Sequence, residues 1–151
     1  MLCSAYAQSY RIAASAVRLT NVYGPGMGAK DTFVVRLLRA AAGGATASVY
    51  GDGAQERDYL YVDDAVAGLR LAWEHALRGP VVIGTGRSTS VYELVALAQA
   101  ATGAPIVTGS VAAPDGEMRA VRVDISYARS LGFEPRVQLA EGLARTWEAL
   151  R

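Results

Sequence analysis

Short, continuous apolar runs alternate along the chain with longer stretches in which apolar residues recur every three or four positions. The first kind of segment predicts buried strands, and the second predicts amphipathic helices. Strands are expected at AVRLTNV (16–22), ASVYGDG (47–53, running into a turn), RDYLYV (57–62), VVIGTG (81–86, running into a turn) and PIVTGSV (105–111). Because such strands alternate with helices, the pattern indicates an α/β fold.

The helices between these strands carry recognisable start and stop signals. They are expected at 2–10, from Asp31 or Thr32 to Gly43-Gly44, from Asp63 or Asp64 to Gly79-Pro80, from Ser90 to Gly103, around 126–131 and at about 139–150. Ser90 and Glu93 form a capping box, in which each side chain satisfies a backbone N–H near the other residue. The predicted apolar faces are Phe33, Val34, Leu37, Leu38 and Ala41 in one helix, and Val66, Leu69, Trp73 and Leu77 in the next.

Composition narrows the class of protein without choosing a function. The 151 residues suffice for one domain, and 52% hydrophobic with 19% charged residues is typical of a globular chain. A net charge of +1 gives no bulk attraction to nucleic acid or to an anionic membrane. Cys3 is the single cysteine, no apolar run is long enough to span a bilayer, and the first residues lack the features of a signal peptide. We therefore expect a cytoplasmic protein.

The first candidate site is VRLTNVYGPG (17–26), where a strand meets an asparagine and a glycine turn. Ligands of open α/β sheets sit beyond the carboxyl ends of strands. Asn21 stands at such an end with an amide that both donates and accepts, and Gly24 and Gly26 would let the backbone approach a ligand. The alternative is that these residues merely build a tight turn.

The second candidate site is VYGDGAQERDYLYVDD (49–64). The planar guanidinium of Arg57 can hold a diphosphate with paired hydrogen bonds, and Asp58 can orient either Arg57 or a neighbouring turn. The alternative is an exposed ion pair among Glu56, Arg57 and Asp58, which would contribute little.

Other candidates for chemistry are weak. Asp63 and Asp64 resemble a metal pair, but helix capping explains them better, and no metal-ligand spacing or GxxxxGK[ST] phosphate loop occurs. His75 stands alone late in a helix, where a surface or capping role is expected. We therefore predict no metal site and no catalytic residue within this chain.

Taken together, RLTNVYGPG, DTFVVRLLRAAAGG, SVYGDGAQERDYLYVDDAVAG, IGTGRSTSVYELVALAQAATG and LGFEPRVQLAEGLARTW resemble the extended short-chain dehydrogenase/reductase family. That family includes NAD-dependent nucleotide-sugar epimerases and dehydratases, decarboxylases and ketoreductases. The segments stand in the family's order and cover nearly the whole chain. The resemblance implies the substrate-binding, C-terminal part of a Rossmann-type enzyme.

The resemblance also implies roles for individual residues. The backbone of Leu19 and Thr20 would lie beside the nicotinamide of NAD or NADP. Asn21 and Arg57 would contact the diphosphate of a UDP- or dTDP-sugar, and Val49 and Tyr50 would run past the base. The family often has a second phosphate-binding arginine before a glycine of the late loop. Here Pro114 and Asp115 precede Gly116, and Arg119 is the nearby candidate substitute.

Two motifs of the family are absent from these residues. The GxxGxxG turn that binds the dinucleotide does not occur, and YxxxK is impossible because Gly26 stands four positions before Lys30, the single lysine. In YxxxK the lysine lowers the pKa of the tyrosine, which then exchanges a proton with the sugar. In the family both motifs precede the RxxNVYGPG strand, so residues 1–24 are expected to be the last part of the Rossmann-like region and 25–151 the substrate-binding region.

The resemblance therefore implies the substrate-binding part of a UDP-glucose 4-epimerase-like epimerase or dehydratase, an isomerase, lyase or oxidoreductase of carbohydrate metabolism. The chain by itself is expected to be inactive and to bind no NAD. The alternative is a non-enzymatic or split-enzyme module that binds a nucleotide sugar. Self-association near residues 1–22, or pairing with a separate Rossmann half, is expected because the edge of the first strand would be unpaired and apolar.

Overall fold

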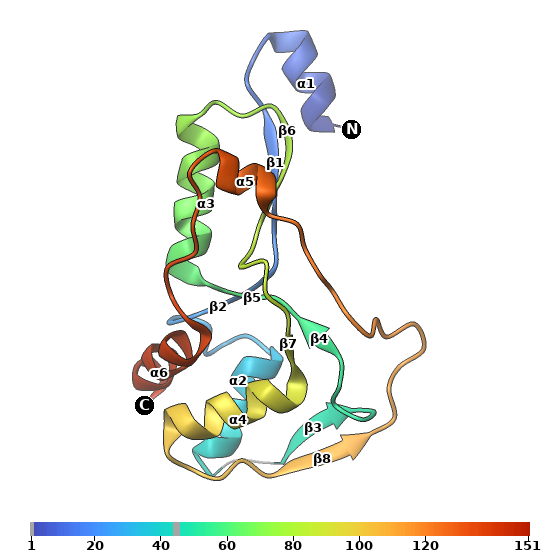
Figure 1. Cartoon of the computed structure of the whole chain (residues 1–151), viewed down its shortest axis with the longest axis vertical. Coiled ribbons are helices and arrows are strands. Elements are labelled where there is room, and N and C mark those ends of the chain that lie inside the picture. The colour runs from blue at the N-terminus through green and yellow to red at the C-terminus, as the bar shows by residue number, and fades with distance from the viewer. Residues whose placement is uncertain (1, 44–45) are drawn as a thin grey trace.

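A computed structural model describes residues 2–43 and 46–151, with the backbone alone at Leu2 and Cys3 (Figure 1). Gly44, part of the predicted helix end, and the Cys3 side chain lie outside the described part. The elements in chain order are α1 (Leu2–Tyr10), β1 (Ser15–Leu19), β2 (Asn21–Tyr23), α2 (Phe33–Ala41), β3 (Ala47–Tyr50), β4 (Glu56–Arg57), β5 (Tyr59–Tyr61), α3 (Val62–Glu74), β6 (Gly79–Ile83), β7 (Thr89–Ser90), α4 (Val91–Thr102), β8 (Thr108–Val111), α5 (Ser126–Ser130) and α6 (Leu139–Leu150). All six expected helices are present.

The strands pair two by two, and three of the four pairs in the described residues are parallel. β1 pairs with β6, β2 with β5 and β3 with β8 in parallel, whereas β4 and β7 are antiparallel. Parallel neighbours need a crossover connection between them. Helix α3 lies in the connection from β1 to β6, and helix α4 lies in the connection from β3 to β8. The α/β prediction is confirmed.

Two predicted strands are each divided in the structure. The N–H of Thr20 donates to the carbonyl of Ile83 (3.2 Å), whereas the N–H of Asn21 donates to the carbonyl of Asp58 (3.1 Å). The chain thus leaves the β1–β6 pair at Thr20 and joins β5 one residue later. Asp58 likewise separates β4 from β5. Predicting one continuous strand in each segment was wrong, because an apolar run does not reveal a change of partner strand.

Two hydrophobic clusters hold these elements together. One lies among β1, β5, β6, α3 and α5 and contains Leu60, Val81 and Ile83. The other lies around α2, α4 and α6 and contains Leu38, Leu94 and Leu143, and α4 packs along α6. Figure 1 shows the first group above the second. Elements on both sides of residue 24 share the first cluster, and the boundary at that residue stays a prediction.

The inward face of α3 differs from the predicted one. Its buried residues are Asp64 and the small residues Ala65, Gly68 and Ala72. A Cβ on Gly68 would clash with the Ile83 side chain, so the helix lies too close to β6 for large side chains. Of the predicted apolar face Leu77 is buried, beyond the helix, whereas Val66, Leu69 and Trp73 are 50%, 45% and 80% exposed. Periodicity marked the helix but chose the wrong face.

Helix starts follow the sequence in two of three cases. Thr32, not Asp31, caps α2, since its hydroxyl accepts from the N–H of Val35 (3.4 Å). The Ser90–Glu93 capping box is present. The N-cap of α3 is Tyr61, with no side-chain cap, so the capping role predicted for Asp63 or Asp64 was wrong. The buried Asp64 carboxylate accepts instead from the N–H groups of residues 136 and 137, both at 3.0 Å.

The end of α3 offers a test of backbone strain. Ala76 has φ +46°, and the N–H of Leu77 reaches back to the carbonyl of Ala72 (3.0 Å), which is the bond that closes a helix through a left-handed residue. Ala76→Gly should raise the free energy of unfolding by about 0.5 kcal/mol, because the strain relieved exceeds the added freedom of the unfolded chain. Ala72→Gly, inside the same helix, should lower it by about 1 kcal/mol. Urea unfolding followed by circular dichroism measures both, and equal signs would contradict the prediction.

Candidate functional site

A cavity of about 510 Å³ lies where β2, β3, β4 and β5 meet the start of α2 and the loop after β8. Its wall includes Asn21, Val49, Tyr50 and Arg57, four of the residues predicted from the sequence to contact a nucleotide sugar. These residues come from three strands and are far apart in the chain. The tertiary structure thus brings the two candidate segments to one site.

Three other predicted residues lie outside the wall of this cavity. Leu19 is at the end of β1 and 39% exposed, and the hydroxyl of Thr20 donates to the carboxylate of Asp58 (2.9 Å). Arg119 lies 3.8 Å from the carboxylate of Asp52, with its side chain 80% exposed. The structure therefore does not bring Arg119 to the cavity as a second arginine beside Arg57.

Asn21 is held in place as a strand residue and not as part of the turn. It pairs with Tyr59 in the β2–β5 ladder, and its side-chain amide donates to the carbonyl of Asp58 (3.0 Å). The turn starts later, at Gly24 (φ +151°), where a Cβ would come within 3.0 Å of Val62. Gly24 therefore serves close packing, while the bond to Asp58 uses one N–H of the Asn21 amide and leaves its oxygen and second N–H.

Arg57 has partners that the sequence reading did not foresee. One nitrogen donates to the carbonyls of Glu56 and Met118, both at 2.8 Å, and another donates to the carboxylate of Glu117. Glu56 pairs with Arg122 (3.0 Å), so the alternative of an ion pair among Glu56, Arg57 and Asp58 was wrong. Glu117 lines the cavity. This residue was not predicted from the sequence, because only the arginines of the late loop were considered.

Asp58 is a fully buried carboxylate that joins separate elements. It accepts from the hydroxyl of Thr20 (2.9 Å) and from the N–H groups of Thr85 (3.0 Å) and Gly86 (2.8 Å). Of the two roles considered for Asp58, orienting a neighbouring turn is the one that the structure shows. The ends of β1 and β6 are thereby fixed beside the strand that carries Arg57.

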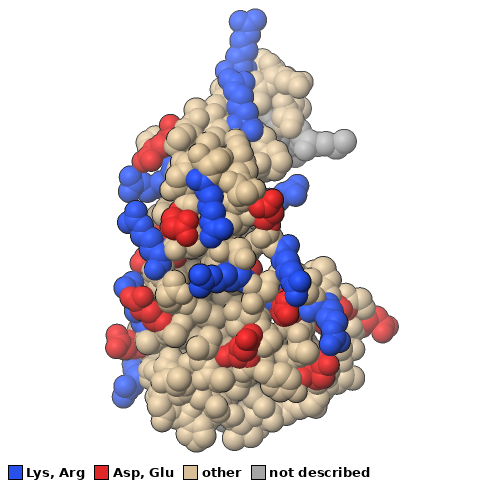
Figure 2. Space-filling view, in the orientation of Figure 1, with Lys and Arg blue, Asp and Glu red and all other residues tan. Residues whose placement is uncertain are grey.

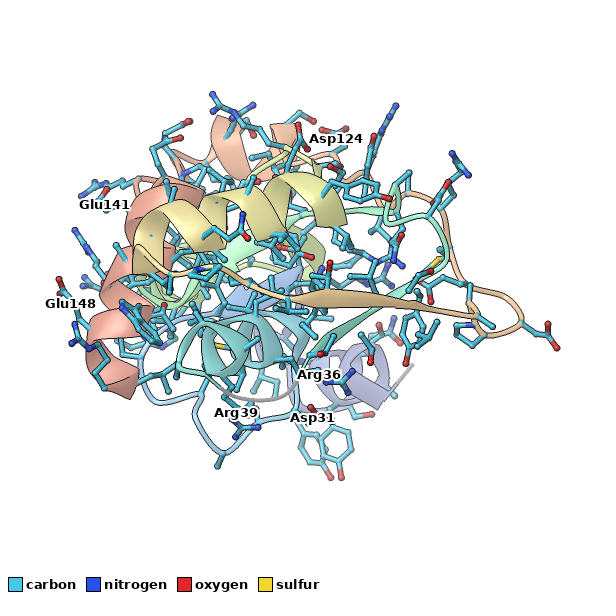
Figure 3. The ribbon with its side chains drawn as sticks, turned by 90° about the horizontal axis from the view of Figure 1, so that it is seen from below. Asp31, Arg36, Arg39, Asp124, Glu141 and Glu148 are labelled. Carbon is cyan, nitrogen blue, oxygen red and sulfur yellow. The ribbon has the colours of Figure 1, made fainter. Side chains whose placement is uncertain are left out.

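A further pair of charges lies at the start of α2. Both carboxylate oxygens of Asp31 accept from the guanidinium of Arg36 (2.7 and 2.8 Å), and Figure 3 shows the two labelled side chains beside each other. This hydrogen bonding keeps the pKa of the Asp31 carboxyl below its ordinary value. Lys30 also lines the cavity. On the face that Figure 2 shows, positive and negative side chains are interspersed.

Two tyrosines of the wall are packing residues at neutral pH. Burial raises the pKa of Tyr59 to about 12. Burial, followed by the proximity of Tyr61, Asp64 and Glu141, raises the pKa of Tyr23 further, and its hydroxyl donates to the carbonyl of Leu139 (3.3 Å). Both side chains therefore stay protonated and neutral.

The Tyr59 pKa predicts how stability changes in alkali. An unfolded tyrosine ionises near pH 10, whereas folded Tyr59 keeps its proton to about pH 12, so the free energy of unfolding should fall as the pH rises through this window. The loss from Tyr59 should reach about 2 kcal/mol. Tyr59→Phe should flatten this part of the profile, and Tyr127→Phe, at an exposed tyrosine, should not. Urea unfolding at pH 9 to 12 would contradict the prediction if the Tyr59→Phe and wild-type slopes agreed.

The described residues contain no group of three or more His, Cys, Asp and Glu side chains that could hold a metal ion. None of the helices described is long and apolar enough to cross a membrane. His75 is exposed and ends α3 through its backbone N–H, which donates to the carbonyl of Leu71 (3.0 Å), in line with the surface or capping role expected for it.

The fold and the site define a class of protein: an α/β unit with three parallel strand pairs and a cavity whose wall carries the amide of Asn21 and the guanidinium of Arg57. Residues 1–84 match the family model described as "NAD dependent epimerase/dehydratase family". The chain belongs to this family. The resemblance seen in its sequence motifs is thereby confirmed.

Relatives that are named as nucleotide-sugar epimerases or dehydratases align along nearly the whole chain. A UDP-glucose 4-epimerase of Mycolicibacterium smegmatis is 37% identical over 150 residues, which are 97% of this chain and 48% of the relative. A dTDP-glucose 4,6-dehydratase of Actinoplanes is 36% identical over 152 residues, 97% of this chain and 46% of the relative. The chain thus spans about half the length of the relatives it matches.

Solved structures agree with this assignment. The UDP-glucose 4-epimerase of Thermotoga maritima, determined with UDP-glucose, superposes with a TM-score of 0.88 at 33% identity, over 99% of this chain and 49% of that one. The UDP-glucuronic acid 4-epimerase of Bacillus cereus, determined with UDP-glucuronic acid and NAD, also gives 0.88 at 26% identity, over 99% and 48%.

Proposed function

We propose that this chain is the nucleotide-sugar-binding part of an NAD(P)-dependent epimerase or dehydratase. The observation that carries the proposal is the convergence of Asn21 and Arg57, from separate strands, on one cavity that Val49 and Tyr50 also line. The amide and the guanidinium would hold the diphosphate, and the β3 residues would lie along the base. Two relatives support this choice of ligand. One is named a dTDP-glucose 4,6-dehydratase, and the other is a UDP-glucose 4-epimerase whose structure was determined with UDP-glucose.

We propose further that the chain binds a nucleotide sugar without turning it over. The residues of this chain that are expected beside the nicotinamide are Leu19 and Thr20. The N–H of Thr20 already donates to the carbonyl of Ile83, and its hydroxyl donates to the carboxylate of Asp58. The 151 residues contain neither GxxGxxG nor YxxxK. These residues alone do not make a dinucleotide site, so NAD or NADP is proposed for the parent enzyme.

Calorimetry with UDP-glucose and dTDP-glucose tests the binding, and an epimerisation assay with added NAD tests the inactivity. Saturable heat without turnover is the expected result. Turnover by the chain unaided would show that the motifs were assigned to the wrong residues. Absence of heat from a protein with a folded circular dichroism spectrum would count against binding.

A partner chain is the second proposal, and the free side of β1 favours it. In the part of the chain that the structure describes, β1 pairs with β6 alone, and Leu19 and Ile12 are 39% and 49% exposed. An unpaired apolar edge invites a further strand. We propose that a second copy or a separate Rossmann half covers it, and a gain in NAD affinity on mixing with such a half would support the split enzyme.

Self-association should depend on this edge. Light scattering of the chain should give a mass that rises with concentration, and Leu19→Lys should reduce the rise, because a charge on an edge strand opposes strand addition. Val107→Lys, at a 65% exposed position outside β1, is the matched control and should behave as wild type. A monomeric wild-type chain at high concentration would contradict the prediction.

A further inference from the structure

The guanidinium expected to receive the diphosphate is already bound to an anion of the same chain. Arg57 donates to the Glu117 carboxylate, and both side chains line the cavity. The side chains of Arg57 and Glu117 are 19% and 28% exposed, so this pair is better shielded from solvent than the other ion pairs of the described residues. Shielding matters because an ion pair in contact with bulk water contributes little.

The loop that carries Glu117 is fixed to β4 by its backbone. The N–H of Glu56 donates to the carbonyl of Arg119 (2.8 Å), and the N–H of Val121 donates to the carbonyl of Glu56 (3.0 Å). Arg57 adds its bond to the carbonyl of Met118 (2.8 Å). These bonds on the residues that follow Glu117 hold this part of the loop beside Arg57.

A carboxylate and a phosphate need the same N–H groups of an arginine. The other guanidinium of the cavity wall, that of Arg36, is likewise engaged by a carboxylate, Asp31. A phosphate that approached Arg57 would meet Glu117 at its donors, and two anions in a partly shielded site repel each other. Ligand binding at Arg57 would therefore be weakened unless the carboxylate moves away.

We propose that Glu117 is an autoinhibitory group that competes with ligand phosphate for Arg57 and so limits the affinity of the site. The proposal deepens the function proposed above and rests on it. Glu117 is thereby expected to lower the affinity for ligands that carry phosphate and to leave the affinity for the nucleoside alone unchanged.

Glu117→Gln tests this inference because it removes the charge and nearly preserves the shape. Calorimetry on the whole chain should show UDP binding about tenfold tighter to the variant than to wild type, and UMP binding should tighten as well. Uridine should bind both proteins equally. Glu56→Gln, which removes a carboxylate that pairs with Arg122 outside the cavity wall, is the matched control and should change UDP affinity less than about twofold.

The possible outcomes separate the inference from the proposed function. Equal or weaker UDP binding by Glu117→Gln overturns the inference, as does a change in uridine affinity, which would place Glu117 at the nucleoside. Binding of UDP by the variant but not by wild type supports it. Failure of both folded proteins to bind UDP overturns the proposed function together with the inference.

Discussion

Arg57→Ala should weaken the binding of UDP-glucose by about 10- to 100-fold. The basis is a charge-assisted hydrogen bond in a partly shielded cavity, which contributes about 1.5–3 kcal/mol. Arg57 is suited to this role because its side chain is 19% exposed and lines the same cavity as Asn21. Arg57→Lys should recover only part of the affinity, since an ammonium keeps the charge but loses the planar pair of donors.

Calorimetry of the purified variants measures this effect. Arg122→Ala is the control, because Arg122 is an exposed arginine that pairs with Glu56 next to Arg57 and does not line the cavity. Its affinity should stay within about twofold of wild type. Arg57 also donates to the carbonyl of Met118 in the late loop, and Arg57→Ala removes this bond. Circular dichroism must therefore show that the variant is still folded. Unchanged affinity of folded Arg57→Ala would favour a purely structural role for the motif.

Asp58→Asn should lower the free energy of unfolding by about 3 kcal/mol. The carboxylate is fully buried and accepts from one hydroxyl and two backbone N–H groups. An asparagine of the same size offers one acceptor oxygen, and its NH₂ group would face a donor, which leaves buried N–H groups unsatisfied. Each such group costs about 1–3 kcal/mol.

Urea unfolding measures the loss, with Asp115→Asn as the control. Asp115 is exposed in the late loop, so the loss there should be within about 0.5 kcal/mol. Because Asp58 joins the ends of β1 and β6 to the strand after Arg57, its variant should also weaken UDP-glucose binding under conditions where it remains folded. A stability equal to that of Asp115→Asn would show that the buried bonds are replaced by others.

Local patterns in the sequence were sufficient for most elements of the fold. The helix over 139–150 and the capping box at Ser90 occur where they were predicted, and the α/β class follows from the alternation of segments. Propensity, periodicity and caps act over a few residues, so they can be read without knowledge of the rest of the chain. They do not say which face of α3 turns inward, because that depends on how close β6 comes to Gly68.

The sequence by itself determined the family, the α/β class with its six helices, and the candidates Asn21, Val49, Tyr50 and Arg57 for one binding site. The tertiary structure alone decided the change of partner strand at Thr20, the burial of Asp58 and the capture of Arg57 by Glu117. These last contacts join residues far apart in the chain, 60 positions in the case of Arg57 and Glu117. Their geometry is set by how separate elements pack, and no short-range pattern in the sequence carries that information.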